Sequence, residues 1–129
     1  MSEFVCRAFL FAFFAAAVSF PVAADEVLTR GIFTGASGHD TRGEVSVVKT
    51  AGGEKLVLGS DFSFDGAPDP KVGFGAGGTY DPESQLSHLR RNAGEQTYDI
   101  PNTLDLSGYD EVYIWCQRYS VPLGVARLR

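Results

Sequence analysis

Glycine and proline recur every several residues from position 31 onward, and they leave little room for a long helix. Between them, β-branched and aromatic residues gather in short runs, as in positions 44–49, 55–58 and 111–117. Short strands separated by turn signals at intervals of about ten residues are typical of an all-β sandwich or barrel. We therefore predict a compact β-sandwich or barrel of about seven or eight short strands, with little or no helix.

Alternation of apolar and polar residues locates the individual strands. The candidate strands, from which we expect about seven or eight to form, cover residues 31–34, 44–49, 55–58, 61–64, 71–74, 85–91, 96–100, 111–117 and 119–128. The segment 51–54 contains two glycines and joins two alternating runs, which is a strong hairpin signal. No internal repeat or linker divides the sequence, so we expect one β domain over residues 25–129.

The first two dozen residues have a different composition and follow the order of a secretory signal. Arg7 precedes the apolar run 8–20, and Pro21 and small residues follow it before Asp25. This is the n-region, h-region and cleavage-site order of a signal peptide. A membrane anchor is the alternative, but a spanning helix needs about 20 apolar residues, and Pro21 ends the run earlier. We expect a signal-peptide helix within residues 1–24, cleavage after Ala24, and a secreted or periplasmic mature domain.

The charge of the chain bears on its partners. The formal net charge is −5, and no run of lysine or arginine interrupts the acidic background. Nucleic acids and anionic membranes are bound by basic patches. We therefore expect no nucleic acid as a partner, and no membrane for the mature form.

The cysteine count is unusual for an exported protein. Of the two cysteines, Cys6 belongs to the leader, so the mature domain keeps only Cys116. Structural cysteines of exported proteins usually come in pairs, and an unpaired one is buried, bonded to another molecule or reactive. On its predicted strand, Cys116 shares a face with Val112 and Ile114, the face that we expect to point to the core. It is either a small buried core residue or a reactive thiol near the strand end beside Arg118.

The opposite face of this strand carries Tyr113, Trp115 and Gln117. Aromatic residues on such a strand usually serve packing, and an electron relay is the alternative.

His39 in a turn-like loop and His88 in a strand are expected at the surface.

Other signals for chemistry are weak. Cysteine and histidine are suitable copper ligands, but these residues are far apart in the sequence. The aspartates at 61, 65 and 69 fit turn formation better than a calcium loop. No phosphate loop or marked nucleophile indicates a classical enzyme. The cofactor is unknown: haem and copper both stay open, and no motif indicates either.

Several short motifs follow one another in a specific order along the mature chain. They are Gly31-x-Phe33, His39 with Gly43, Leu58-Gly-x-Asp61-Phe62, Gly66-x-Pro68-Asp69, Gly94-x-Gln96-x-Tyr98-x-Ile100-Pro101, Tyr113-Ile114-Trp115-Cys116 and Val121-x-x-Gly124-x-Ala126-x-Leu128. In this order they resemble the DM-thirteen domain family, also called the electron transfer DM-thirteen family. The resemblance implies a secreted or extracellular β-rich module with one characteristic cysteine, here Cys116; members of the family often stand beside haem-binding domains, whereas we expect a single-domain member here.

The resemblance also implies a function, namely an exported small redox or electron-transfer module that acts through Cys116. A lone cysteine cannot close an internal disulfide, so its redox chemistry must be intermolecular or use a cofactor. The expected partner is a redox partner protein or a small oxidant in the exported space. The alternative is a non-catalytic extracellular binding or adhesion module in which Cys116 is a buried structural residue.

Overall fold

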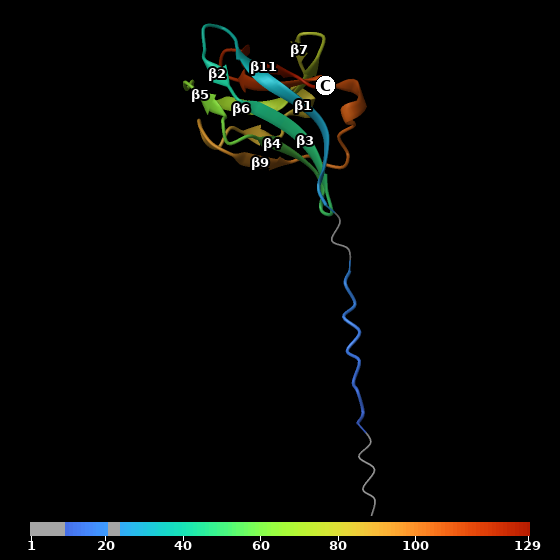
Figure 1. Ribbon diagram of the computed structural model, residues 1–129. Helices are drawn as coiled ribbons and strands as arrows, with labels where there is room; N and C mark the ends of the chain where they lie inside the picture. The colour runs from blue at the N-terminus through green and yellow to red at the C-terminus, as the bar shows by residue number, and fades with distance from the viewer. Residues whose placement is uncertain (1–9, 21–23) are drawn as a thin grey trace, which may run out of the picture.

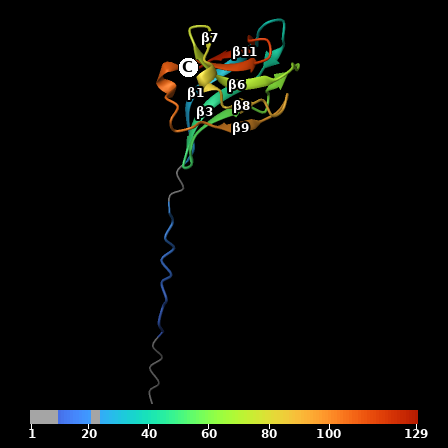
Figure 2. The same ribbon diagram turned by 180° about the vertical axis from the view of Figure 1, so that it is seen from behind.

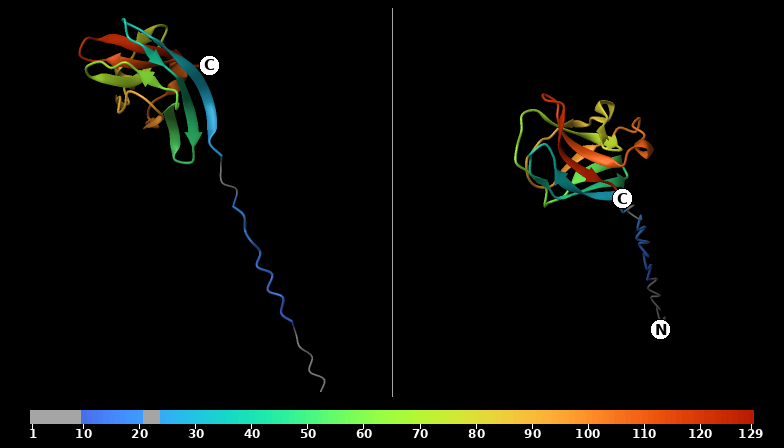
Figure 3. Two further views of the ribbon diagram at one scale, coloured as in Figure 1. Left: turned by 60° about the vertical axis from the view of Figure 1, so that its left-hand side comes forward. Right: turned by 90° about the horizontal axis from the view of Figure 1, so that it is seen from above.

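The computed structural model describes residues 10–20 and 24–129. Its longest strand, β1 (Glu26–Gly35), connects the two halves of the main sheet. The first part of β1 pairs with β3 (Glu44–Thr50), and its last three residues pair with β11 (Val121–Arg127). The register shifts between Val27 and Thr29, and such bulges bend a strand. Because both halves of the sheet share β1, the sheet curls into a half-barrel (Figures 1 and 3).

The strand order of this antiparallel sheet is β7-β6-β10-β11-β1-β3-β4-β9, with β8 beside β6. The other strands are β2 (Thr41–Arg42), β4 (Gly53–Leu58), β5 (Ser63–Phe64), β6 (Pro70–Ala76), β7 (Thr79–Tyr80), β8 (Ser87–His88), β9 (Gln96–Asp99) and β10 (Glu111–Cys116), while β2 and β5 pair separately. Two 3₁₀ turns, η1 (Pro82–Ser84) and η2 (Leu106–Gly108), complete the described chain. The prediction of an all-β fold is confirmed, and the barrel alternative fits better because one sheet curls around the core.

The hairpin predicted around residues 51–54 is confirmed. Thr50 pairs with Gly53, and the Thr50 hydroxyl donates a hydrogen bond to the Gly53 carbonyl at 2.8 Å. Gly53 has a φ of +113°, a conformation that glycine adopts without steric cost. The tight turn brings β3 and β4 into register, so the alternating residues of both strands point into the half-barrel.

The inner face of the curled sheet forms the hydrophobic core. Its side chains come from both halves of the sheet, and those that are fully buried include Val45, Leu56, Leu58, Val72, Phe74, Val112 and Ile114. Phe33 and Phe62 meet edge to face, with ring centroids 5.6 Å apart. Because strands from both ends of the sequence supply this core, residues 24–129 stabilise each other as one unit.

The apolar segment 10–20 extends away from the sheet without contacting it (Figure 2). It has no helix, so the prediction of a signal-peptide helix is wrong for these residues. An isolated helix shorter than about 12–15 residues is marginal without a packing partner, and this segment has none. Within the described residues, no helix is long and apolar enough to cross a membrane. Cys6, Arg7 and residues 21–23 of the cleavage region lie outside the described residues, so the leader and its cleavage stay predictions.

Candidate functional site

Cys116 is the last residue of β10, between Pro70 of β6 and Val121 of β11. Its side chain is 1% exposed and packs in the core cluster with Val112 and Ile114. The prediction that these three side chains share the core face is confirmed. A thiol that is partly open to solvent, as the redox interpretation suggested, is not observed.

The thiol of Cys116 donates a hydrogen bond to the carbonyl oxygen of Pro68 at 3.4 Å. Pro68 belongs to residues 65–69, the segment between β5 and β6 that we call the covering loop. Pro68 itself is exposed, so a single layer of chain separates the sulfur from solvent. Gly66 and Asp69 have φ values of +97° and +51°, and these left-handed positions bend the loop over the strand end.

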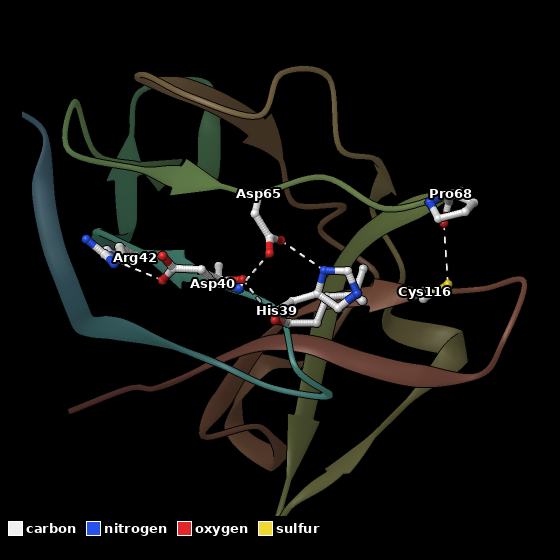
Figure 4. A network of polar contacts seen from close by, with 8 residues as sticks. His39, Asp40, Arg42, Asp65, Pro68 and Cys116 are labelled. Atoms are coloured by element: carbon white, nitrogen blue, oxygen red, sulfur yellow. Dashed lines mark hydrogen bonds and ion pairs between the residues drawn. The ribbon is translucent and has the colours of Figure 1, made fainter.

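Side-chain contacts fasten the start of the covering loop (Figure 4). The Asp65 carboxylate accepts hydrogen bonds from the Asp40 backbone N–H at 3.0 Å and from His39 Nδ1 at 2.9 Å. Arg42 binds the Asp40 carboxylate in turn, at 2.7 and 2.9 Å. The hydrogen bond from Asp40, followed by that from His39, lowers the pKa of Asp65. His39, which the sequence predicted to be a surface loop residue, thus also anchors the loop.

The far end of the covering loop is fastened to β6 and to the turn that follows β10. The Asp69 carboxylate lies 3.0 Å from Lys71 Nζ in β6, and the Asp69 carbonyl accepts the Gln117 backbone N–H at 3.4 Å. Both ends of the loop are therefore held, while the exposed Pro68 lies between them. Opening the loop requires these polar contacts and the packing of Ala67 against the core to break, but does not require a strand to leave the sheet.

The structure does not bring the other predicted candidates to the thiol. His39 Nδ1 bonds Asp65, and Arg118 lies exposed in the turn after β10. His88 is exposed in β8, as expected. Among residues 10–20 and 24–129, no group of three or more histidine, cysteine or acidic side chains is arranged to hold a metal ion. The site that the structure describes is therefore a covered thiol, held by the Pro68 carbonyl and by core side chains.

The outer face of β10 holds a second cluster, which the sequence did not reveal. Glu111 and Tyr113 are 3% and 2% exposed, although alternation predicted an outward direction. They are covered because β7 folds Tyr80 over them. The Cβ of an alanine at position 73 or 75 would come within 3.0 Å of the Tyr80 or Tyr113 ring. The two alternating glycines of β6 were the one sequence signal for this packing.

Comparison with known proteins gives one match. A family model described as "Electron transfer DM13" matches residues 33–128, from within β1 to just beyond β11. No curated protein and no solved structure matches the chain.

Proposed function

Because the chain belongs to the DM13 electron-transfer domain family, we propose that it is an exported redox module in which Cys116 is the reactive residue. The observation that carries the proposal is the position of the thiol directly beneath one short loop. Cys116 is free, and in the described part of the chain its sulfur bonds the carbonyl of the exposed residue Pro68. This position, at the end of β10 and under a loop held by polar contacts, lets the thiol be reached without unfolding of the sheet.

The proposed step is thiol–disulfide exchange with an oxidised partner protein or a small disulfide. The deprotonated sulfur of Cys116 attacks one sulfur of the partner disulfide, whose S–S bond breaks as the mixed disulfide forms. Cys116 is oxidised, and the leaving sulfur is reduced and takes up the proton that Cys116 has lost. Since residues 24–129 contain no second cysteine, a thiol of another molecule must resolve the mixed disulfide.

This step requires the covering loop to open, because a disulfide cannot reach a side chain that is 1% exposed. The contacts of Asp65 with His39 and Asp40 are exposed at the surface, and such contacts contribute little to stability. The loop therefore opens more readily than the sheet unfolds. The rate of exchange follows the frequency of this local opening.

A second candidate function is supported by the burial itself. With Cys116 packed against Val112 and Ile114 in the core, the domain also fits an extracellular binding or adhesion module whose cysteine is structural. The two functions differ in the way the thiol becomes accessible: local opening of the loop in the first, and global unfolding in the second.

The experiment measures the reaction of the native thiol with 4,4′-dithiodipyridine, a small disulfide that releases a coloured product. Asp65→Asn removes the charge that holds His39 and the Asp40 amide, so we expect Cys116 to react several-fold faster than in the wild type. Asp99→Asn is the matched control, because Asp99 is an exposed aspartate of β9 that forms an ion pair with Lys55 of β4, and these strands lie on the other side of β1 from β10.

Three outcomes decide between the two functions. Faster reaction in Asp65→Asn alone supports the redox module. Reaction at the rate of global unfolding in all three proteins, or equal acceleration by both substitutions, rejects it in favour of the structural cysteine.

Export is tested separately, by sequencing the N-terminus of the protein recovered outside the cytoplasm, where we expect Asp25.

A further inference from the structure

The hydroxyl of Tyr113 donates a hydrogen bond to Glu111 Oε2 at 2.8 Å on the outer face of β10. A proton moves directly between two groups only when their heavy atoms lie about 2.6–3.2 Å apart, so this pair is within range. The other oxygen of Glu111 accepts the Gly78 backbone N–H at 2.6 Å. With Glu111 only 3% exposed, the carboxylate is held in place as the proton acceptor of Tyr113.

Packing alone does not explain this pair. The Tyr113 ring fills the space beneath Tyr80, with centroids 5.6 Å apart, and phenylalanine would fill the same space. Burying both a hydroxyl and a carboxylate has a desolvation cost, and apolar replacements of such pairs are often neutral or stabilising. The pair therefore provides a chemical property that an apolar pair of the same shape would lack.

A path for an electron leads from Tyr113 to the surface. The Trp115 ring meets Tyr113 edge to face at a centroid distance of 6.4 Å and stacks on Tyr80 at 4.4 Å with an interplanar angle of 17°. Trp115 is only partly buried, whereas Tyr80 and Tyr113 are buried. An oxidant in solution can approach Trp115 but cannot approach Tyr113.

We propose that Tyr113 is a second redox centre, independent of the thiol, that gives one electron through Trp115 to a strong one-electron oxidant while its proton passes to Glu111. The oxidant, an outer-sphere metal complex or an oxidising radical, takes an electron from the indole. Tyr113 replaces that electron and loses its phenolic proton along the existing hydrogen bond. The oxidant is reduced by one electron, Tyr113 becomes a neutral radical and Glu111 becomes a carboxylic acid.

The environment of Tyr113 supports proton transfer that accompanies oxidation. Burial, followed by the hydrogen bond to Glu111, raises the pKa of Tyr113 above that of a free tyrosine. The phenol therefore keeps its proton in the resting protein. Once the ring is oxidised, the phenol becomes a strong acid, and Glu111 accepts the proton without any rearrangement.

The test uses photogenerated ruthenium(III) tris-bipyridine as the oxidant and the full chain with Cys116→Ala and Tyr119→Phe, so that no signal comes from the Cys116 thiol or from Tyr119, which is 64% exposed and would react directly. We expect a tyrosyl radical in electron paramagnetic resonance after freeze-quenching, and its loss in Tyr113→Phe. Tyr109→Phe is the matched control, because the Tyr109 hydroxyl also donates to a carboxylate, Asp81, at 2.5 Å, but its ring stacks on Phe74. The signal should persist in this control.

Glu111→Gln tests the proton acceptor. Because a positioned base contributes roughly 100-fold or more to such steps, transient absorption should show tyrosyl formation slowed by about that factor. Tyr113→Phe keeps the ring and removes only one hydroxyl, so the test of the redox centre does not depend on whether Glu111→Gln folds. A radical that persists in Tyr113→Phe, or a folded Glu111→Gln protein that oxidises at the wild-type rate, overturns the proposal. Since Cys116 is absent throughout, neither result affects the proposed thiol function.

Discussion

Replacing Cys116 with serine and with alanine tests whether water reaches the side chain at position 116. The side chain is 1% exposed in the core cluster. A serine hydroxyl is shorter than a thiol, and the sulfur already lies 3.4 Å from the Pro68 carbonyl, so serine loses this partner. A buried hydroxyl without a partner costs roughly 1–3 kcal/mol. Alanine introduces no polar atom and loses only one small apolar group, which costs about 1 kcal/mol.

We therefore expect stability to fall in the order wild type, Cys116→Ala, Cys116→Ser. Urea unfolding followed by Trp115 fluorescence gives the free energies of unfolding, with equal slopes for the three proteins. In a thermal scan, each kcal/mol lowers the Tm of a domain of this size by about 4–8 °C. Serine as stable as the wild type, or more stable than alanine, would show that water reaches position 116 and would refute the reasoning from burial.

Three further predictions concern the loop and the sheet. Because the pKa of Asp65 is lowered in the folded protein, its bonds stabilise the closed loop above the ordinary aspartate pKa and are lost as pH falls through the folded value. Because acid lowers the thiolate fraction of both proteins, the two are compared at each pH: the faster reaction of Asp65→Asn with dithiodipyridine should approach the wild-type rate as pH falls, since the wild-type loop then opens as well. Gly43→Ala should abolish cooperative thermal unfolding, because its φ is +106° and a Cβ would lie 2.5 Å from Phe62 Cα. Lys55→Met breaks an exposed ion pair and should change the urea midpoint by the equivalent of less than about 1 kcal/mol.

The parts of the fold that sequence predicted well are those in which local pattern and burial agree. Alternation in residues 44–49 and 55–58 identified β3 and β4, because a half-buried strand exposes every second side chain. The same rule identified the core face of β10. Its fully buried residues at 112 and 114 were expected from spacing alone.

Other elements depend on partners that are distant in the sequence. β1 begins five residues earlier than predicted, since residues 26–30 pair with β3 although their sequence does not alternate between apolar and polar residues. The strand predicted over 85–91 is reduced to β8, Ser87–His88. The cover over Cys116 and the burial of Glu111 arise in the same way, from a loop and a hairpin that fold back over β10. No local pattern encodes such contacts.

The pairing of β1 with β11 has a mechanical consequence. Arg30 and Arg129 exchange backbone hydrogen bonds at 3.0 and 2.8 Å, and the pairing continues from there to Gly35 and Gly124. Since the strands are antiparallel neighbours, a force that separates Glu26 from Arg129 acts at one end of this ladder. It loads the hydrogen bonds one after another, like a zipper, and never loads them all together in shear. The pairing of β1 with β11 therefore yields at low force when the protein is pulled by these two ends.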